Sequence, residues 1–110
     1  MPNVKIYVDE AAFEAVRQEI AARLPDLRTM LCDRLAVAPA ACQFAVLPVL
    51  ALADQPRINT ELHILPHASR SRARLQEVAA EIRAILGAAS GLSVAVRIAT
   101  LDAASYVALK

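Results

Sequence analysis

Two groups of residues in this sequence could do chemistry: a proline at position 2 and three closely spaced arginines. If Met1 is removed, the nitrogen of Pro2 becomes a secondary amine. Such an amine, buried among apolar groups and near cations, holds its proton less tightly, because desolvation and like charge both disfavour the charged form. A base whose pKa lies near the working pH can take a proton from a carbon beside a carbonyl and return it elsewhere. Pro2 is therefore a candidate general base, whereas a retained Met1 would leave its nitrogen as an amide without basicity.

The arginines Arg70, Arg72 and Arg74 stand where a helix is predicted to begin. A guanidinium group can bond a carboxylate through two donors, and a helix N-terminus adds a favourable potential for an anion. Residues 70 and 74 share a helix face if the helix has begun by residue 70, so at most two of the arginines can converge on one ligand. The alternative is a solvated first turn, in which exposed ion pairs contribute little.

A strand–helix–strand pattern that occurs twice must position these residues. Period-two alternation or runs rich in Val, Leu and Phe predict strands over 4–8, 42–52, 58–65 and 92–99. Apolar residues spaced by three or four predict a helix over 13–35 and a second helix whose apolar stripe covers 75–86 and which ends near Gly87 and Gly91. Within these elements Pro25 predicts a kink or a fresh helix, and Pro48 predicts a bulge or an edge position in the second strand.

This order of elements predicts an α/β (α+β) fold in a single domain, residues 1–110. Two right-handed β-α-β units would share a four-stranded mixed sheet with both helices on one face. The second face of the sheet has no sequence left to cover it, so another subunit is expected to do so. Hydrophobic residues make up 57% of the chain, which is more than so small a subunit can hide in its own core.

Composition and charge exclude several classes of function. Twelve Lys and Arg residues nearly balance 11 Asp and Glu residues, and aromatic residues are only 4%, which argues against nucleic-acid and membrane-surface binding. The longest apolar stretch, 44–53, is too short to span a bilayer, and no secretory signal is recognisable. Cys32 and Cys42 are expected to be free thiols in a reducing compartment, so we expect a cytoplasmic protein. Glu61 and His63 share a strand face but lack a third ligand, so neither a metal nor a cofactor is expected.

Several segments together resemble the tautomerase superfamily: Pro2 followed at once by a strand, the Pro-containing turn at 37–41, the sequence 61–72, and the tail 101–110. Within the superfamily, the resemblance is greatest to the 5-carboxymethyl-2-hydroxymuconate isomerase family, and it is more distant to the macrophage migration inhibitory factor family. The resemblance implies a homotrimer whose tail packs on a neighbouring subunit. It also implies cofactor-independent isomerisation of a small keto or enol acid, with Pro2 as the base.

The resemblance also implies a substrate site, from which this chain departs at two positions. Arg70 or Arg72 would anchor a substrate carboxylate, and Tyr106 would either line the pocket or fasten the tail. Gln43 stands on the second strand where related proteins often carry an arginine, and Ala12 occupies another such position. The absence of an arginine at each of these two positions argues against a dicarboxylate substrate. They keep open an alternative, in which the chain is a catalytically inactive trimeric scaffold or binding subunit.

Overall fold

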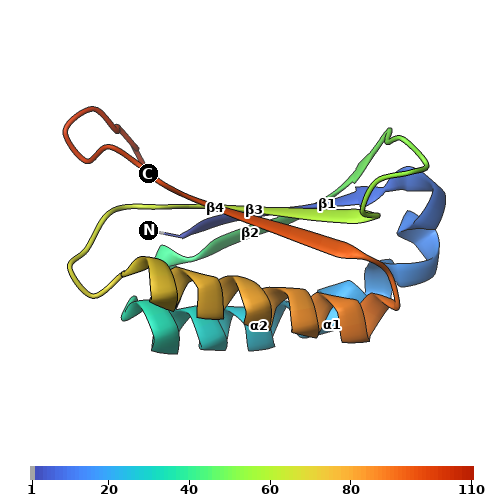
Figure 1. The fold of residues 1–110 in the computed structure, drawn as a ribbon, viewed down its shortest axis with the longest axis horizontal. Coiled ribbons are helices and arrows are strands. Elements are labelled where there is room, and N and C mark those ends of the chain that lie inside the picture. The colour runs from blue at the N-terminus through green and yellow to red at the C-terminus, as the bar shows by residue number, and fades with distance from the viewer. Residues whose placement is uncertain (1) are drawn as a thin grey trace.

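The computed structural model describes residues 2–110 as one four-stranded sheet with two helices packed on one face (Figure 1). The strands are β1 (Asn3–Asp9), β2 (Gln43–Val49), β3 (Ile58–Ile64) and β4 (Val94–Thr100). The helices are α1 (Glu10–Leu35) and α2 (Arg72–Ser90), with a short 3-10 turn, η1 (Pro39–Ala41), before β2. Within residues 2–110 neither helix is long and apolar enough to cross a membrane.

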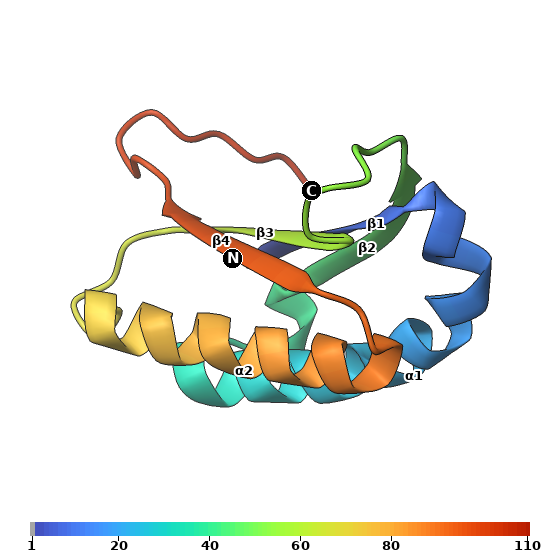
Figure 2. The same ribbon diagram turned by 45° about the vertical axis from the view of Figure 1, so that its right-hand side comes forward.

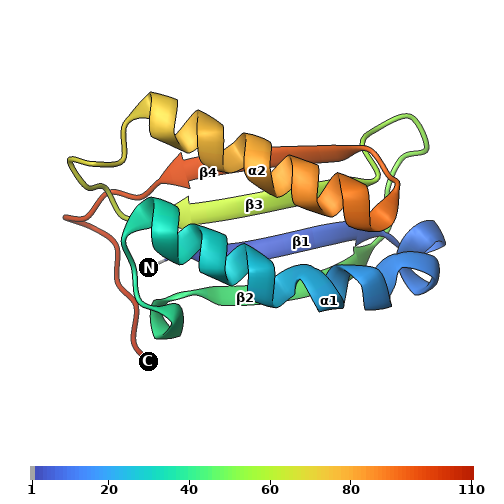
Figure 3. The same cartoon turned by 90° about the horizontal axis from the view of Figure 1, so that it is seen from below.

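The strand order is β2-β1-β3-β4, and each outer strand lies parallel to its inner neighbour. A helix connects each parallel pair, so the chain forms two β-α-β units, as predicted. The two inner strands, β1 and β3, run antiparallel, which makes the sheet mixed. As a result, β1 and β2 begin at the same end of the sheet at which β3 and β4 terminate. Helix α2 also begins at this end (Figure 3).

Alternation along the inner strands decides which side chains the helices cover. Val4, Ile6 and Val8 of β1 are buried against the helices, and the intervening residues point to the other face of the sheet. The apolar stripes of both helices complete this core: Val16, Ile20, Leu27, Met30, Leu31 and Leu35 of α1, and Val78, Ile82 and Leu86 of α2. No helix covers the second face of the sheet in the described part of the chain (Figure 1).

The two prolines inside predicted elements behave differently. Helix α1 continues through Pro25 as one helix, and its first turns lie at an angle to the rest (Figure 1). Of the two alternatives predicted at Pro25, a kink or a fresh helix, the fresh helix does not form. Pro48 lies in β2, an outer strand of the sheet, which agrees with the predicted edge position. An outer strand tolerates proline because its free edge needs no N–H donor at that position.

Helix α2 is longer than its apolar stripe indicates. Ser71 caps its start, because the hydroxyl oxygen accepts a hydrogen bond from the N–H of Arg74 at 3.1 Å. The helix passes through Gly87 and ends only at Gly91, whose φ of 71° gives the left-handed cap that glycine favours. The end predicted near Gly87 and Gly91 is confirmed at Gly91, and the start predicted at the arginine cluster is confirmed at Arg72.

Candidate active site

A hollow of about 210 Å³ lies at the end of the sheet where β1 begins. Three of the predicted site residues, Pro2, Gln43 and Tyr106, line it together. Pro2 is buried directly before β1, and its carbonyl oxygen accepts a hydrogen bond of 3.0 Å from the N–H of Gln43. This bond continues the pairing of β1 with β2 and fixes Pro2 relative to the sheet. The remaining lining residues are Asn3, Ala41, Ala108, Leu109 and Lys110.

After β4 the C-terminal tail turns and loops back over the sheet (Figure 2), and four of its residues line this hollow. The N–H of Leu101 donates to the carbonyl of Ile64 at 2.7 Å, which holds the start of the tail beside the end of β3. The carbonyl of Asp102 then accepts hydrogen bonds from the N–H groups of Ser105 and Tyr106, at 3.1 and 2.9 Å. The tail therefore lines the hollow that contains Pro2 of the same chain. The predicted packing of the tail on a neighbouring subunit stays a prediction.

The predicted arginines lie outside this hollow. Arg70 donates through Nη1 to the carbonyl of Leu65 at 2.6 Å and through Nη2 to the carbonyl of Leu35 at 3.1 Å. Leu35 is the last residue of α1, whose final carbonyls have no partner within the helix. Arg70 thus connects the end of α1 to the segment that follows β3. Arg72 is exposed at the first position of α2. Because α2 begins only at residue 72, Arg70 and Arg74 do not share a helix face.

The cations at the hollow are lysines, which the sequence analysis did not identify. Lys5 donates through Nζ to Oδ1 of Asn3, a lining residue, and Lys110 lines the hollow itself. The position of Lys5 could have been predicted from the alternation of β1. Residues two apart on a strand lie on the same face, so Lys5 lies on the same face as Asn3. No sequence signal indicates Lys110, since only the turn at Asp102 brings the tail to Pro2.

Comparison with known proteins gives matches among solved structures alone, because no family model and no curated protein matches this sequence. One similar structure is N1, a member of the cis-3-chloroacrylic acid dehalogenase family, at a TM-score of 0.72 and 14% identity over 96% of this chain and 79% of that one. A second is a fused 4-OT protein described as an asymmetric trimer, at 0.71 and 11% identity over 96% and 91% of the two chains.

A third similar structure is the macrophage migration inhibitory factor-like protein of Entamoeba histolytica. Its TM-score is 0.67 and its identity 10%, over 97% of this chain and 94% of that chain. The chain has the macrophage migration inhibitory factor-like fold. Identities this low show the shared fold and nothing of the chemistry. In this fold, the start of β1 and the tail of the present chain meet at one hollow.

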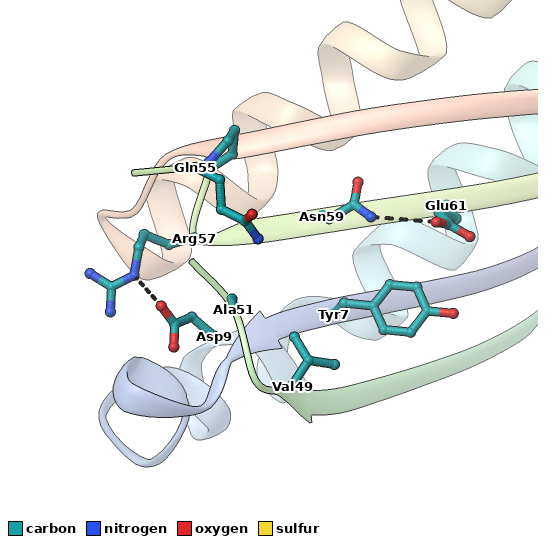
Figure 4. Close-up of a pocket in the computed structure, with 9 residues that line it drawn as sticks. Tyr7, Asp9, Val49, Ala51, Gln55, Arg57, Asn59 and Glu61 are labelled. Carbon is teal, nitrogen blue, oxygen red and sulfur yellow. Dashed lines mark hydrogen bonds and ion pairs between the residues drawn. The ribbon is translucent and has the colours of Figure 1, made fainter. Parts of the chain in front are cut away.

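A second hollow, of about 270 Å³, lies at the opposite end of β1 in this macrophage migration inhibitory factor-like fold (Figure 4). Asp9 and Arg57 form an ion pair there, with 2.9 Å between Oδ2 and Nε. The other oxygen of Asp9 accepts a 3.0 Å hydrogen bond from the N–H of Ala11 and so caps α1. Asn59 donates at 3.4 Å to Glu61, which lies two residues further along the same strand, β3. These contacts hold the first turn of α1 to the residues entering β3, so we assign this cluster a structural role.

No metal centre is found in the part of the chain that the structure describes, residues 2–110. No three His, Cys, Asp or Glu side chains there gather closely enough to hold a metal ion. Glu61 and His63 do lie on the same face of β3, as the alternation predicts.

Proposed function

We propose that this chain is a cofactor-independent tautomerase or isomerase in which Pro2, freed by removal of Met1, acts as the general base. The observation that carries the proposal is the meeting of buried Pro2 with Gln43 and Tyr106 at one hollow. Structural likeness to a member of the cis-3-chloroacrylic acid dehalogenase family and to a fused 4-OT protein supports membership of the tautomerase superfamily. The nearer resemblance to 5-carboxymethyl-2-hydroxymuconate isomerase rests on the sequence segments alone.

The proposed reaction is a proton transfer between carbon and oxygen of a small acid. The amine of Pro2 takes a proton from the carbon beside a carbonyl, and an enolate forms. The side-chain amide of Gln43 and the hydroxyl of Tyr106 are the neutral donors available to the developing oxyanion. Return of the proton to a different atom completes the isomerisation without a cofactor.

The substrate class follows from the size and charge of the hollow. A volume of about 210 Å³ is below the ~300–1,000 Å³ typical of ligand pockets, which favours a small molecule. Lys110 at the hollow and Lys5 beside it attract an anion and disfavour the protonated form of a nearby amine. We therefore propose a small keto or enol acid with a single carboxylate as the substrate.

One observation favours a second function, that of a binding subunit without turnover. No arginine is among the residues that line the hollow within the described part of the chain. A chain that binds a carboxylate weakly and orients it poorly would keep the fold and lose catalysis. This alternative keeps the same hollow but assigns no chemistry to Pro2.

An assay of proton exchange separates the two functions. Protein whose loss of Met1 has been verified by mass spectrometry is mixed with phenylpyruvate or hydroxyphenylpyruvate in deuterated buffer. The proposal predicts enol–keto interconversion and deuterium incorporation beside the carbonyl at rates proportional to protein concentration. Binding of these acids without any exchange above the buffer rate would refute the catalytic proposal and favour the binding subunit.

We also propose that the chain forms a homotrimer, in which neighbouring copies cover the open face of the sheet. Leu50, Leu52, Val107 and Leu109 are 70 to 94% exposed in the single chain, so these large apolar side chains are left uncovered by its own core. Light scattering is expected to give three times the chain mass of 11.8 kDa. Removal of residues 101–110 should shift the assembly toward smaller species at low concentration, whereas Arg83→Ala on the outside of α2 should not. A monomer at micromolar concentration would contradict this proposal.

A further inference from the structure

The two cysteines lie side by side although ten residues separate them. Cys32 lies in the last turns of α1, and Cys42 immediately precedes β2. Their sulfur atoms are 4.0 Å apart, and both side chains are half-buried. Because an S–S bond is about 2.05 Å long, the sulfurs need to approach by only about 2 Å, a distance within reach of side-chain rotation.

The backbone on both sides of the pair is already fixed by hydrogen bonds. The carbonyl of Cys32 accepts from the N–H of Val37 at 3.3 Å, within the C-terminal cap of α1. The N–H of Cys42 donates to the carbonyl of Pro39 at 3.1 Å, at the end of η1. The segment between the cysteines is therefore a short ordered connection that keeps the two thiols together.

A surface hollow of about 270 Å³ gives access to one member of the pair. Cys42 lines it together with Arg28, Leu24, Pro25 and Phe44. The cation of Arg28 suits an anionic reagent such as oxidised glutathione. Burial raises the pKa of Cys42 to about 11, and the neighbouring Cys32 adds to this rise. The thiol form of Cys42 therefore prevails near neutral pH, and because the thiolate is the form that attacks a disulfide, oxidation proceeds faster in alkaline solution.

We propose that Cys32 and Cys42 are a redox modification site, which a low-molecular-weight disulfide oxidises to an intramolecular disulfide. One protein thiol loses its proton and attacks a sulfur of the reagent, forming a mixed disulfide and releasing one reagent thiol. The second protein thiol then attacks the protein sulfur of the mixed disulfide and releases the second reagent thiol. Two protein sulfurs are oxidised, two reagent sulfurs are reduced, and the two protons pass to the released thiols.

The new bond would act next to the hollow that contains Pro2. Cys42 is followed by Gln43, whose N–H holds the carbonyl of Pro2 and whose side chain lines that hollow. The disulfide would tie the end of α1 to the start of β2 and so restrict the motion of Gln43. This inference does not depend on the proposed isomerase activity, because the bond can form whether or not Pro2 is a base.

Mass spectrometry of the whole protein tests the proposal. Reduced protein is incubated with oxidised glutathione at mildly alkaline pH and trapped with a thiol-alkylating reagent. We expect a loss of the mass of two hydrogen atoms, no alkylation, a single-chain band on a non-reducing gel, and a cross-linked peptide that joins Cys32 to Cys42. Cys32→Ala and Cys42→Ala serve as matched controls, each leaving one thiol that either forms a stable glutathione adduct or stays free.

Three outcomes would overturn the proposal, and all are read on the wild-type chain. These are glutathione adducts that persist on either cysteine, disulfides between chains, and two thiols that stay free while urea-unfolded chain is oxidised by the same reagent.

A second measurement tests whether the disulfide stabilises the connection between α1 and β2. Closing a loop of this length should raise Tm by several degrees relative to the reduced protein, and the Cys32→Ala/Cys42→Ala double variant should show no such dependence on the reagent. An identical Tm for the reduced and the oxidised protein would refute the expected stabilisation by the disulfide.

Discussion

Protein that retains Met1 is expected to lose at least about a hundredfold in kcat/KM toward a small keto acid, relative to protein that begins at Pro2. A general base contributes roughly 10²- to 10⁴-fold to the rate of a proton transfer. With Met1 in place, the nitrogen of Pro2 is a tertiary amide that has no available lone pair. The two forms differ by one residue, can be separated and quantified by mass spectrometry, and are compared by steady-state kinetics.

Pro2→Ala gives a graded version of the same test. The processed variant keeps a primary amine at the same place, so we expect a loss of about tenfold, between the wild type and the Met1-retaining protein. The assembly should be unchanged, because the hydrogen bond from Gln43 involves the backbone carbonyl of residue 2 and not its ring. Light scattering checks this point. Equal rates for all three proteins would show that Pro2 is not the base and would favour the binding subunit.

Arg70→Ala is expected to destabilise the protein by about 2–4 kcal/mol, because two carbonyls lose a charged donor. Each such bond is worth roughly 1.5–3 kcal/mol, and solvent screening lowers their sum because Arg70 is only half-buried. Chemical denaturation measures the change in the free energy of unfolding. Arg70→Lys should recover part of the loss, since one ammonium cannot reproduce the two-pronged geometry of a guanidinium group. Arg72→Ala should change stability by less than about 0.5 kcal/mol, because Arg72 is exposed.

The same variants test the predicted carboxylate anchors. If Arg72 reaches a substrate across a subunit boundary, Arg72→Ala should lower kcat/KM about ten- to a hundredfold for a charged acid. The uncharged ester of that acid should lose much less. Arg74→Ala is the control at the capped start of α2. Equal, small effects at Arg72 and Arg74 would remove the arginines from the site and leave the lysines and Gln43 as ligands. A wild-type stability for Arg70→Ala would contradict the role that its contacts imply.

The fold was predictable because its signals are local. The alternation of Val4, Ile6 and Val8 indicates both a strand and its covered face, and the stripe from Val78 to Leu86 does the same for α2. Of the two positions predicted for Pro48, a bulge or an edge strand, the edge strand is confirmed, since proline has few places in a sheet. The end of α2, predicted near Gly87 and Gly91, lies at Gly91, where the backbone adopts the left-handed conformation that glycine favours.

The candidate site was only partly predictable because its members meet through contacts distant in sequence. Gln43 could be placed near Pro2, because β1 and β2 are parallel neighbours in a β-α-β unit. Arg70 was expected to bind a substrate carboxylate. Its guanidinium group instead donates a hydrogen bond to the carbonyl of Leu35, which lies 35 residues earlier in the chain. Lys110 reaches the hollow only through the turn at Asp102, and nothing in the tail sequence alone gives its direction.

Because Pro2 is held by the sheet, the position of residue 2 and the ligand selectivity of the hollow are two properties that evolution could change independently. Its carbonyl is bonded to Gln43 at the start of the sheet, so the position of its nitrogen belongs to the rigid scaffold. The opposite wall of the hollow, formed by Tyr106 and residues 108–110, belongs to a tail without helix or strand. Insertions and substitutions are tolerated best in such segments. Related chains could therefore diversify in ligand selectivity through the tail while the position of residue 2 stays constant.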